Sequence, residues 1–333
     1  MARNRLINID QVVSSTGKIL SVDDYGVTPP PDADGHSASA SEAFQLAGLY
    51  GGGGSTARTS CQKTSFAGSA DFVNHGDLPV ATGGTMGSGS NGDYILARSA
   101  MVNGTPNIQS QRKALATNAD GVTWGSSAQE GFFRAVTSTE SEQMMVGGWV
   151  GFFNFTGNNE KGQFHTAATG VAWGVLTSPM IRMSSANDSN QVLCSHGLGS
   201  SNTSFTQDMV TLKFDDSSYQ VTHAAHSYRQ QRTCSASTTE HAVFHGGYVD
   251  GLSNLLSDRR KYAFASPATT IDWGMLLETN NGAGCSGNGH EALTVGGYGK
   301  NSGEKFSLST NSASVAHGSL YESSEFGWSG SGN

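Results

Sequence analysis

A short apolar segment that ends in two glycines recurs along this sequence at intervals of about fifty residues. Three copies are unambiguous and occupy residues 144–149, 243–248 and 293–298. Their glycine pairs are Gly147 and Gly148, Gly246 and Gly247, and Gly296 and Gly297. Apolar residues alternate before each pair, as in a half-buried strand, and paired glycines at a strand end allow a bulge or the close passage of another backbone. A repeat of this length predicts a stacked or radial architecture.

Three weaker copies follow from the same spacing, at residues 44–48, 94–98 and 193–197. The first position of the pair then falls at residues 47, 97, 147, 196, 246 and 296. A chain of 333 residues could form two domains, but six near-equal units favour one closed domain.

The composition favours an all-β protein. The chain has 44 glycines, 14% charged residues and a net charge of −8, whereas a helical protein would be dominated by Ala, Leu, Glu and Lys. The acidic balance speaks against a nucleic-acid partner, which needs a basic face. No apolar run approaches the ~20 residues that span a bilayer, and no apolar signal core follows the basic N-terminus. We therefore expect no membrane insertion and no signal peptide.

A second landmark is a tryptophan followed by glycine, at Trp124, Trp173 and Trp273. His75 and His317 stand in its place in two other units, and four units carry a leucine two residues after the glycine. An aromatic residue at a fixed point of each repeat indicates a packing wedge between neighbouring sheets. The alternative is a set of tryptophans that stack on a ligand, but repetition around a ring favours architecture.

A third landmark is a Ser-containing turn that closes each unit, a few residues before the next glycine-pair strand. The last unit has no successor, and the strand at 44–50 lacks a well-formed predecessor. Pairing the stretch at 325–329 with the strand at 44–50 would close a ring and leave no open edge. The sequence therefore predicts a six-bladed β-propeller.

The predicted organisation is an N-terminal arm at 1–36 and a propeller at 37–333. The blades lie near 37–92, 93–142, 143–190, 191–240, 241–290 and 291–333, with the C-terminal strand closing the ring. Within the arm, residues 12–22 alternate around Gly17 and Lys18 and predict a small hairpin. The arm is either an attachment device or a disordered leader.

These repeats resemble kelch repeats of the galactose-oxidase-like propeller superfamily. They are still more similar to a divergent group of repeat proteins encoded by tailed bacteriophages. Residues 70–81 are close to the pattern of that group, with a short insertion, and residues 268–276 are another version of it. Two features depart from that pattern. The arginine expected after the leucine is irregular, with Arg134, Arg182 and Arg232 as candidates, and the fourth unit reads Val221 and Thr222 in place of the aromatic–glycine pair.

The resemblance implies a kelch-like structural protein of a tailed-phage virion, assembled in the host cytoplasm. It would be associated with the tail, as a fibre or tail-tip/adaptor component. Its partners would be other virion proteins, bound through the arm and a propeller face. The alternatives are a host-receptor or glycan-binding head of a fibre, a capsid decoration protein and, last, an enzyme of the galactose-oxidase type.

The sequence presents no recognisable catalytic constellation. The copper site of galactose oxidase needs two histidines, two tyrosines and a cross-linked cysteine, and no residue-by-residue match exists here. His196 and His245 lie near glycine-pair strands and are either ligands of a channel ion or structural residues. Cys234 and Cys285 occupy equivalent points of consecutive repeats, too far apart for a disulfide, and are expected to be small buried residues. We therefore predict no enzyme, no catalytic residue, no cofactor and no metal.

Overall fold

The computed structural model divides the chain into two compact units, Met1–Pro30 and Pro31–Asn333. The structure describes residues 12–13, 19–20, 41–46, 57–83, 85–98, 100–102, 105–150, 154–195, 197–199, 208–223, 230–249, 254–323 and 328–332. In the first unit the described residues form a hairpin of β1 (Val12–Val13) and β2 (Ile19–Leu20), which confirms the hairpin predicted at 12–22. The rest of the expected arm at 1–36 lies outside the described residues.

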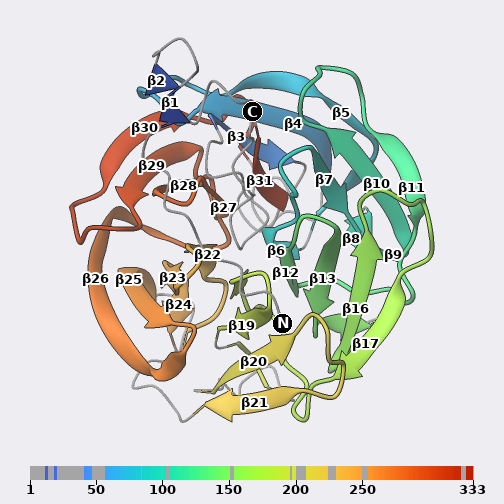
Figure 1. Ribbon diagram of the computed structural model, residues 1–333. Helices are drawn as coiled ribbons and strands as arrows, with labels where there is room; N and C mark the ends of the chain where they lie inside the picture. The colour runs from blue at the N-terminus through green and yellow to red at the C-terminus, as the bar shows by residue number, and fades with distance from the viewer. Residues whose placement is uncertain are drawn as a thin grey trace. The chain divides into compact units, whose positions relative to one another are not determined.

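The second unit is a six-bladed β-propeller (Figure 1), as the sequence predicted, and its described residues include no helix. From the axis outwards, blade 1 contains β31 (Trp328–Gly332), β3 (Glu42–Leu46), β4 (Arg58–Ser65) and β5 (Val73–Thr82). Blade 2 contains the three-stranded sheet of β7 (Tyr94–Ala97), β10 (Gln109–Ala114) and β11 (Val122–Ser126). We assign β6 (Thr85–Ser88) to this blade as its inner strand, because a bridge from Ser90 to Ile95 directly after β6 joins it to β7. Blade 3 contains β12 (Arg134–Ser138), β13 (Glu142–Val146), β16 (Asn158–Gln163) and β17 (Val171–Val175).

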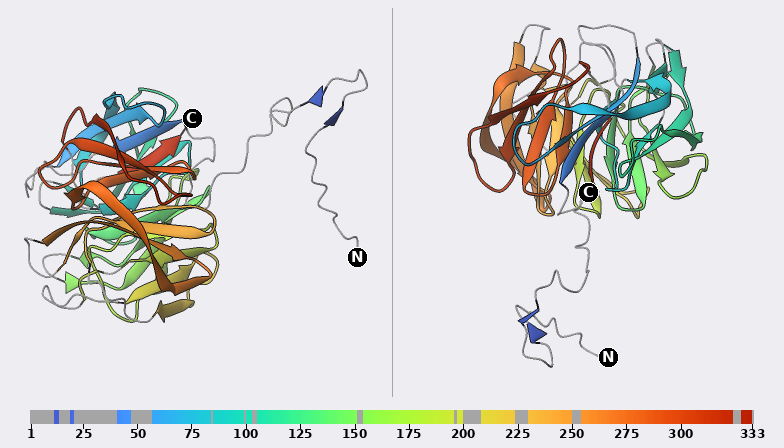
Figure 2. Two further views of the ribbon diagram at one scale, coloured as in Figure 1. Left: turned by 90° about the vertical axis from the view of Figure 1, so that its left-hand side faces the viewer. Right: turned by 90° about the horizontal axis from the view of Figure 1, so that it is seen from above.

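The other three blades repeat this antiparallel order. Blade 4 contains β18 (Ser185–Asn187), β19 (Gln191–Cys194), β20 (Met209–Lys213) and β21 (Gln220–His223). Blade 5 contains β22 (Cys234–Ser237), β23 (His241–His245), β25 (Asn254–Ala263) and β26 (Ser266–Asn280). Blade 6 contains β27 (Gly284–Gly287), β28 (Glu291–Val295), β29 (Ser302–Ser307) and β30 (Val315–Ser319). Seen from the side, the strands run between the two faces of the ring (Figure 2).

Short additional strands extend three of the connections between second and third blade strands. They are β8 (Ala100–Val102) with β9 (Thr105–Asn107) in blade 2, β14 (Trp149–Val150) with β15 (Asn154–Phe155) in blade 3, and β24 (Tyr248–Val249), which pairs with β25 in blade 5.

The end of the chain closes the ring. Strand β31 pairs antiparallel with β3, from Leu46 opposite Trp328 to Glu42 opposite Gly332, next to the C-terminus in Figure 1. This is the pairing expected between the two ends of the repeat region. The innermost strand of blade 2 adds a further link, because β6 pairs in parallel with both β31 and β12. Across the axis, β6 also lies close to the inner strands β18, β22 and β27.

The sequence repeats and the sheets differ in phase by one strand. The unit at 93–142 includes β12, but β12 pairs with β13 at the start of the following unit. In the same way, β22 pairs with β23 and β27 with β28 across the unit boundaries. Each of these sheets therefore combines strands of two successive repeats, so neighbouring units are joined by backbone hydrogen bonds as well as by side-chain packing.

The glycine pairs end the second strands β13, β23 and β28 in a left-handed conformation. Gly147 and Gly148 have φ angles of 58° and 111°, and the other two pairs have positive φ angles as well. A Cβ atom on Gly148 would lie 2.4 Å from Cγ of Arg134, so a side chain does not fit there. The pair is therefore required both for its backbone conformation and for the close approach of the inner strand.

Candidate functional site

The three tryptophans of the repeat lie between neighbouring blades. Trp173 on β17 donates a hydrogen bond from Nε1 to the carbonyl oxygen of Lys213 in blade 4 (3.0 Å), and Lys161 Nζ lies 3.7 Å from the centre of its ring. The indole nitrogens of Trp124 and Trp273 likewise donate to third strands of the next blade, at Gln163 (3.2 Å) and Ser307 (3.1 Å). The three rings lie at three different seams and form wedges, not one stacking surface.

A lysine or arginine on the third strand of a blade reaches the next blade. Arg112 donates to the carbonyl oxygen of Phe164 (2.7 Å), and Lys161 donates to that of Phe214. Lys261 and Lys305 make the equivalent bonds to Leu308 (3.2 Å) and Phe66 (2.7 Å), and the second of these crosses from blade 6 to blade 1. Each acceptor directly follows a third strand and is buried. These cations are therefore part of the bonding between blades.

The glycine after each tryptophan belongs to the same seam. Gly174 has a φ angle of 75°, and a Cβ there would lie 2.2 Å from the carbonyl oxygen of Ser217 in blade 4. The leucine two positions further on is buried in all four units that carry it, at Leu78, Leu176, Leu276 and Leu320. Where His75 replaces the tryptophan, its Nε2 bonds to the carbonyl oxygen of Leu115 in blade 2 (2.9 Å).

A buried ion triad joins blades 2 and 3. Arg98, which stands at the second position of a weak glycine pair, forms an ion pair with Glu160, and Arg134 Nη1 lies 3.4 Å from the other carboxylate oxygen. All three side chains are closed to solvent. Burial lowers the pKa of both guanidinium groups, and the Glu160 carboxylate opposes that shift. The candidate Arg134 is thus a structural residue of the inner strand.

The other two candidate arginines lie in the turns before inner strands and have left-handed backbones, with φ angles of 57° at Arg182 and 55° at Arg232. The backbone amide of Arg182 donates to the carbonyl oxygen of Phe133 (3.0 Å). The backbone amide of Arg232 donates in turn to the carbonyl oxygen of Arg182 (2.8 Å). Nη1 of Arg182 donates to Gln231 Oε1 (3.2 Å) and to the Tyr248 hydroxyl (3.3 Å). Burial and then the charge of Arg232 lower the pKa of Arg182 to about 10.

The histidines near the glycine pairs do not form a channel site in the part of the chain that the structure describes. His245 is fully buried between blades 5 and 6, where a ring nitrogen bonds to Thr294 Oγ1 (2.6 Å) and the ring packs on Phe306. Burial, followed by the charge of Arg259, lowers its pKa to about 3. His196 lies outside the described residues.

The four cysteines are buried and form no disulfide, and burial raises the pKa of Cys61, Cys194 and Cys234 to about 12. The described residues contain no group of three or more His, Cys, Asp or Glu side chains placed to hold a metal ion. They also contain no helix with the length and apolar character that a membrane crossing requires.

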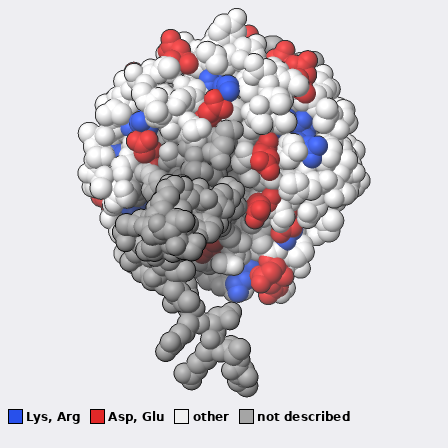
Figure 3. Space-filling view, turned by 45° about the horizontal axis from the view of Figure 1, so that its top comes forward, with Lys and Arg blue, Asp and Glu red and all other residues white. Residues whose placement is uncertain are grey.

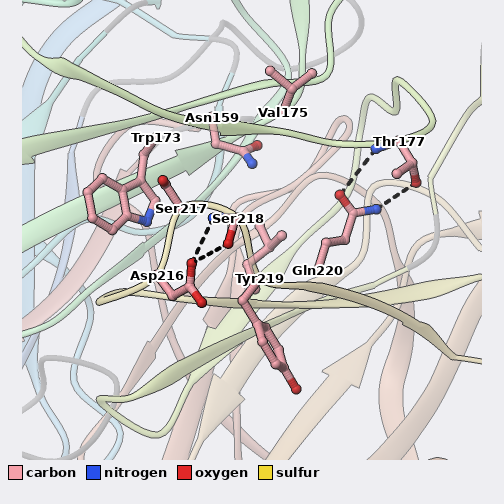
Figure 4. A pocket seen from close by; sticks show the side chains of 10 residues that line it. Asn159, Trp173, Val175, Thr177, Asp216, Ser217, Ser218, Tyr219 and Gln220 are labelled. Atoms are coloured by element: carbon pink, nitrogen blue, oxygen red, sulfur yellow. Dashed lines mark hydrogen bonds between the residues drawn. The ribbon is translucent and has the colours of Figure 1, made fainter.

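A pocket of about 360 Å³ opens at the seam between blades 3 and 4 (Figure 4). Its walls are built from β16, β17, β20, β21 and the turn that joins β20 to β21. The lining residues are Asn159, Trp173, Val175, Thr177, Leu212, Asp216, Ser217, Ser218, Tyr219 and Gln220. Its size falls in the range of about 300–1,000 Å³ that is typical of ligand pockets.

Polar side chains of the pocket are held by hydrogen bonds before any ligand enters. Asp216 Oδ1 accepts bonds from the backbone amide (2.9 Å) and the hydroxyl (2.7 Å) of Ser218, and these bonds lower the pKa of the carboxyl. Gln220 pairs twice with Thr177 across the seam: its Oε1 accepts from the Thr177 amide (3.1 Å) and its Nε2 donates to the Thr177 hydroxyl (2.7 Å). The pocket therefore has a preformed polar wall on both blades.

Because the comparisons with known proteins give no match, the class of this protein is defined by its fold. No protein-family model matches the chain. A search of curated proteins also finds no significant match. The fold and the seams define the chain as a six-bladed β-propeller whose recurring residues join one blade to the next.

Sequence reasoning identified the glycines and tryptophans but missed the cations and the pocket. The cations carried a usable signal, because Arg112, Lys161, Lys261 and Lys305 recur near the repeat spacing. The pocket carried none, since Asn159 and Asp216 follow no repeat motif and meet only when blades 3 and 4 pack together.

Proposed function

We propose that this protein is a structural component of a tailed-phage virion, associated with the tail as a fibre or tail-tip/adaptor protein, and that its propeller is a rigid interaction platform of the kelch-like type. The observation that carries the proposal is the use of the repeated residues. The glycine pairs, the tryptophans and the third-strand cations are all engaged within or between blades. The residues that recur around the ring thus stiffen a disc and leave recognition to its faces.

The surface supports a protein partner over a nucleic acid. Lysine and arginine lie interspersed with aspartate and glutamate on the described part of the face in Figure 3, and the net charge is −8. A phosphate backbone would need a continuous basic face. Mixed charges suit docking to other virion proteins, where they set orientation more than affinity.

The test begins with the particle itself. Mass spectrometry of purified virions, and of tails separated from capsids, should find the protein in the tail fraction. Its absence from particles would contradict the virion role, and its presence on isolated capsids would favour a decoration protein.

The attachment segment is tested by deletion. A chain without residues 1–36 should fold as a ring but fail to be incorporated into particles. Full retention of the truncated ring would show that the arm is not the anchor.

A second function, the recognition of a host glycan at a fibre tip, is favoured by one observation, the pocket between blades 3 and 4. A catalytic function of the galactose-oxidase type is not part of the proposal. Metal analysis of the purified protein tests that point, because stoichiometric copper would contradict a non-enzymatic role.

A further inference from the structure

We propose that the pocket between blades 3 and 4 binds a neutral sugar ring through the amide of Asn159 and the carboxylate of Asp216. The proposal deepens the second candidate function, since it names the ligand class of that pocket. It does not depend on the role of the protein in the particle.

Asn159 supplies a hydrogen-bond donor to the pocket. The residue is 2% exposed, and Oδ1 accepts a hydrogen bond from the Gly147 amide at 3.4 Å. This bond sets the orientation of the amide, so that Nδ2 points into the pocket (Figure 4) without a hydrogen bond to any described residue. Because this donor opens into the pocket, a bound molecule that offers an acceptor oxygen could pair with it in place of water.

Asp216 supplies the complementary acceptor at the rim. Both bonds from Ser218 go to Oδ1, which holds the carboxylate in place and leaves Oδ2 outside these two bonds. A molecule that donates a hydrogen bond to Oδ2 would form a charge-assisted bond, which is stronger than one between neutral groups.

A hydroxyl group meets both requirements, because it donates and accepts. Asp216 is the one charged residue in the pocket lining, so a phosphate or carboxylate ligand would be repelled. An ammonium group would suit Asp216 but offers no acceptor to the Asn159 donor. A ring with several neutral hydroxyls can place one at each residue, and this is the chemistry of a sugar.

The remaining lining suits the apolar face of such a ring. Trp173, Val175 and Leu212 contribute apolar surface, and Val175 is 63% exposed. The paired bonds between Gln220 and Thr177 hold blades 3 and 4 in register at this point. The site is therefore largely preformed, which lowers the entropic cost of binding a small ligand.

The experiment uses the full chain and saturation-transfer difference NMR. Glucose, galactose, mannose and N-acetylglucosamine are the neutral probes, and glucuronate and glucosamine are the charged ones. The test variant is Asp216→Asn, an isosteric change at an exposed position. The matched control is Asp188→Asn, because Asp188 also accepts turn hydrogen bonds, from Asn190 (3.0 Å) and Gln191 (2.8 Å), but lies outside the pocket.

The proposal expects saturation transfer to at least one neutral sugar, about tenfold weaker binding in Asp216→Asn, and unchanged binding in Asp188→Asn. It is overturned if none of the four neutral sugars binds, if only a charged probe binds, or if Asp216→Asn binds as well as the native chain. Particle incorporation of Asp216→Asn is measured in parallel and should be unchanged, so a failure of sugar binding is distinguishable from a failure of the virion role.

Discussion

Arg98 of blade 2 and Glu160 of blade 3 form an ion pair that is closed to solvent, and Gly162 leaves the space that the guanidinium fills. A Cβ on Gly162 would lie 1.6 Å from Nη1 of Arg98. Arg98 also bonds to Ser110 Oγ (3.3 Å) and to the carbonyl oxygen of Ser126 (3.2 Å). The arginine that replaces a glycine of the repeat is thus accommodated by a glycine on the neighbouring blade.

Replacing Glu160 by Gln should destabilise the ring strongly. The change leaves Arg98 and Arg134 buried without a counter-charge, and breaking a buried pair costs about 3–5 kcal/mol. Urea unfolding followed by circular dichroism measures the loss. The control is Glu278→Gln, which breaks the exposed pair with Lys300 and should cost at most about 1 kcal/mol. Equal losses in the two variants would show that the triad is not a specific stabilising element.

Replacing Gly148 by Ala should reduce the stability of the ring more than replacing Gly68 by Ala. Both glycines have positive φ angles, 111° and 80°, so both variants are expected to lose about 1 kcal/mol through backbone strain. Only Gly148 also faces a neighbouring atom at 2.4 Å, whereas no atom lies within 4 Å of a Cβ on Gly68. Thermal unfolding of the two variants separates the effect of backbone strain from that of the steric clash. A smaller loss of stability in Gly148→Ala than in Gly68→Ala would contradict the close approach of Arg134.

Stability should fall as the pH drops from about 6.5 towards 3. His245 has its pKa lowered from 6.5 to about 3, so in this window the unfolded chain binds a proton that the folded chain does not. The contribution of His245 to the free energy of unfolding is therefore complete above pH 6.5. Below that pH the free energy of unfolding decreases, with a limiting slope of about 1.4 kcal/mol per pH unit. Burial lowers the pKa of His75, His223, His241 and His317 as well, so they act in the same direction.

Urea unfolding at pH 7 and pH 5 measures this dependence. His245→Gln should be less stable than the native chain at pH 7 and should lose less stability between the two pH values. The control is His290→Gln at an exposed position, which should keep the native dependence. An unchanged dependence in His245→Gln would rule out the buried histidine as a source of acid sensitivity.

Removing residues 328–333 should prevent the ring from closing. The deletion takes away β31 and exposes an unpaired edge on β3, and such edges promote aggregation. Size-exclusion chromatography should show aggregated or expanded protein without a cooperative melting transition. Removing residues 1–30, which form a separate compact unit, is the matched control and should leave the transition of the ring unchanged. A compact monomer after the C-terminal deletion would contradict closure by β31.

The number of blades and the closure of the ring were accessible from the sequence because they are periodic. The glycine pairs at 147, 246 and 296 mark strand ends by backbone conformation, which is a local property of each residue. The tryptophans at 124, 173 and 273 mark the seams because each blade meets its neighbour in the same way. A repeated local signal can be read without knowledge of which strands pair.

The phase of the sheets, the Arg98–Glu160–Arg134 triad and the pocket were decided by the tertiary structure alone. Arg98 and Glu160 are 62 residues apart, and although Arg98 stands in a weak copy of the glycine pair, no repeat motif contains Glu160 or indicates that the two meet. Asn159 and Asp216 come from different blades, and their polar atoms line one pocket only because the seam brings β16 and the β20–β21 turn together. The sequence by itself determines the repeated units, because each unit follows from local conformational preferences. Contacts between units depend on how whole sheets pack against each other, and no short segment encodes that packing.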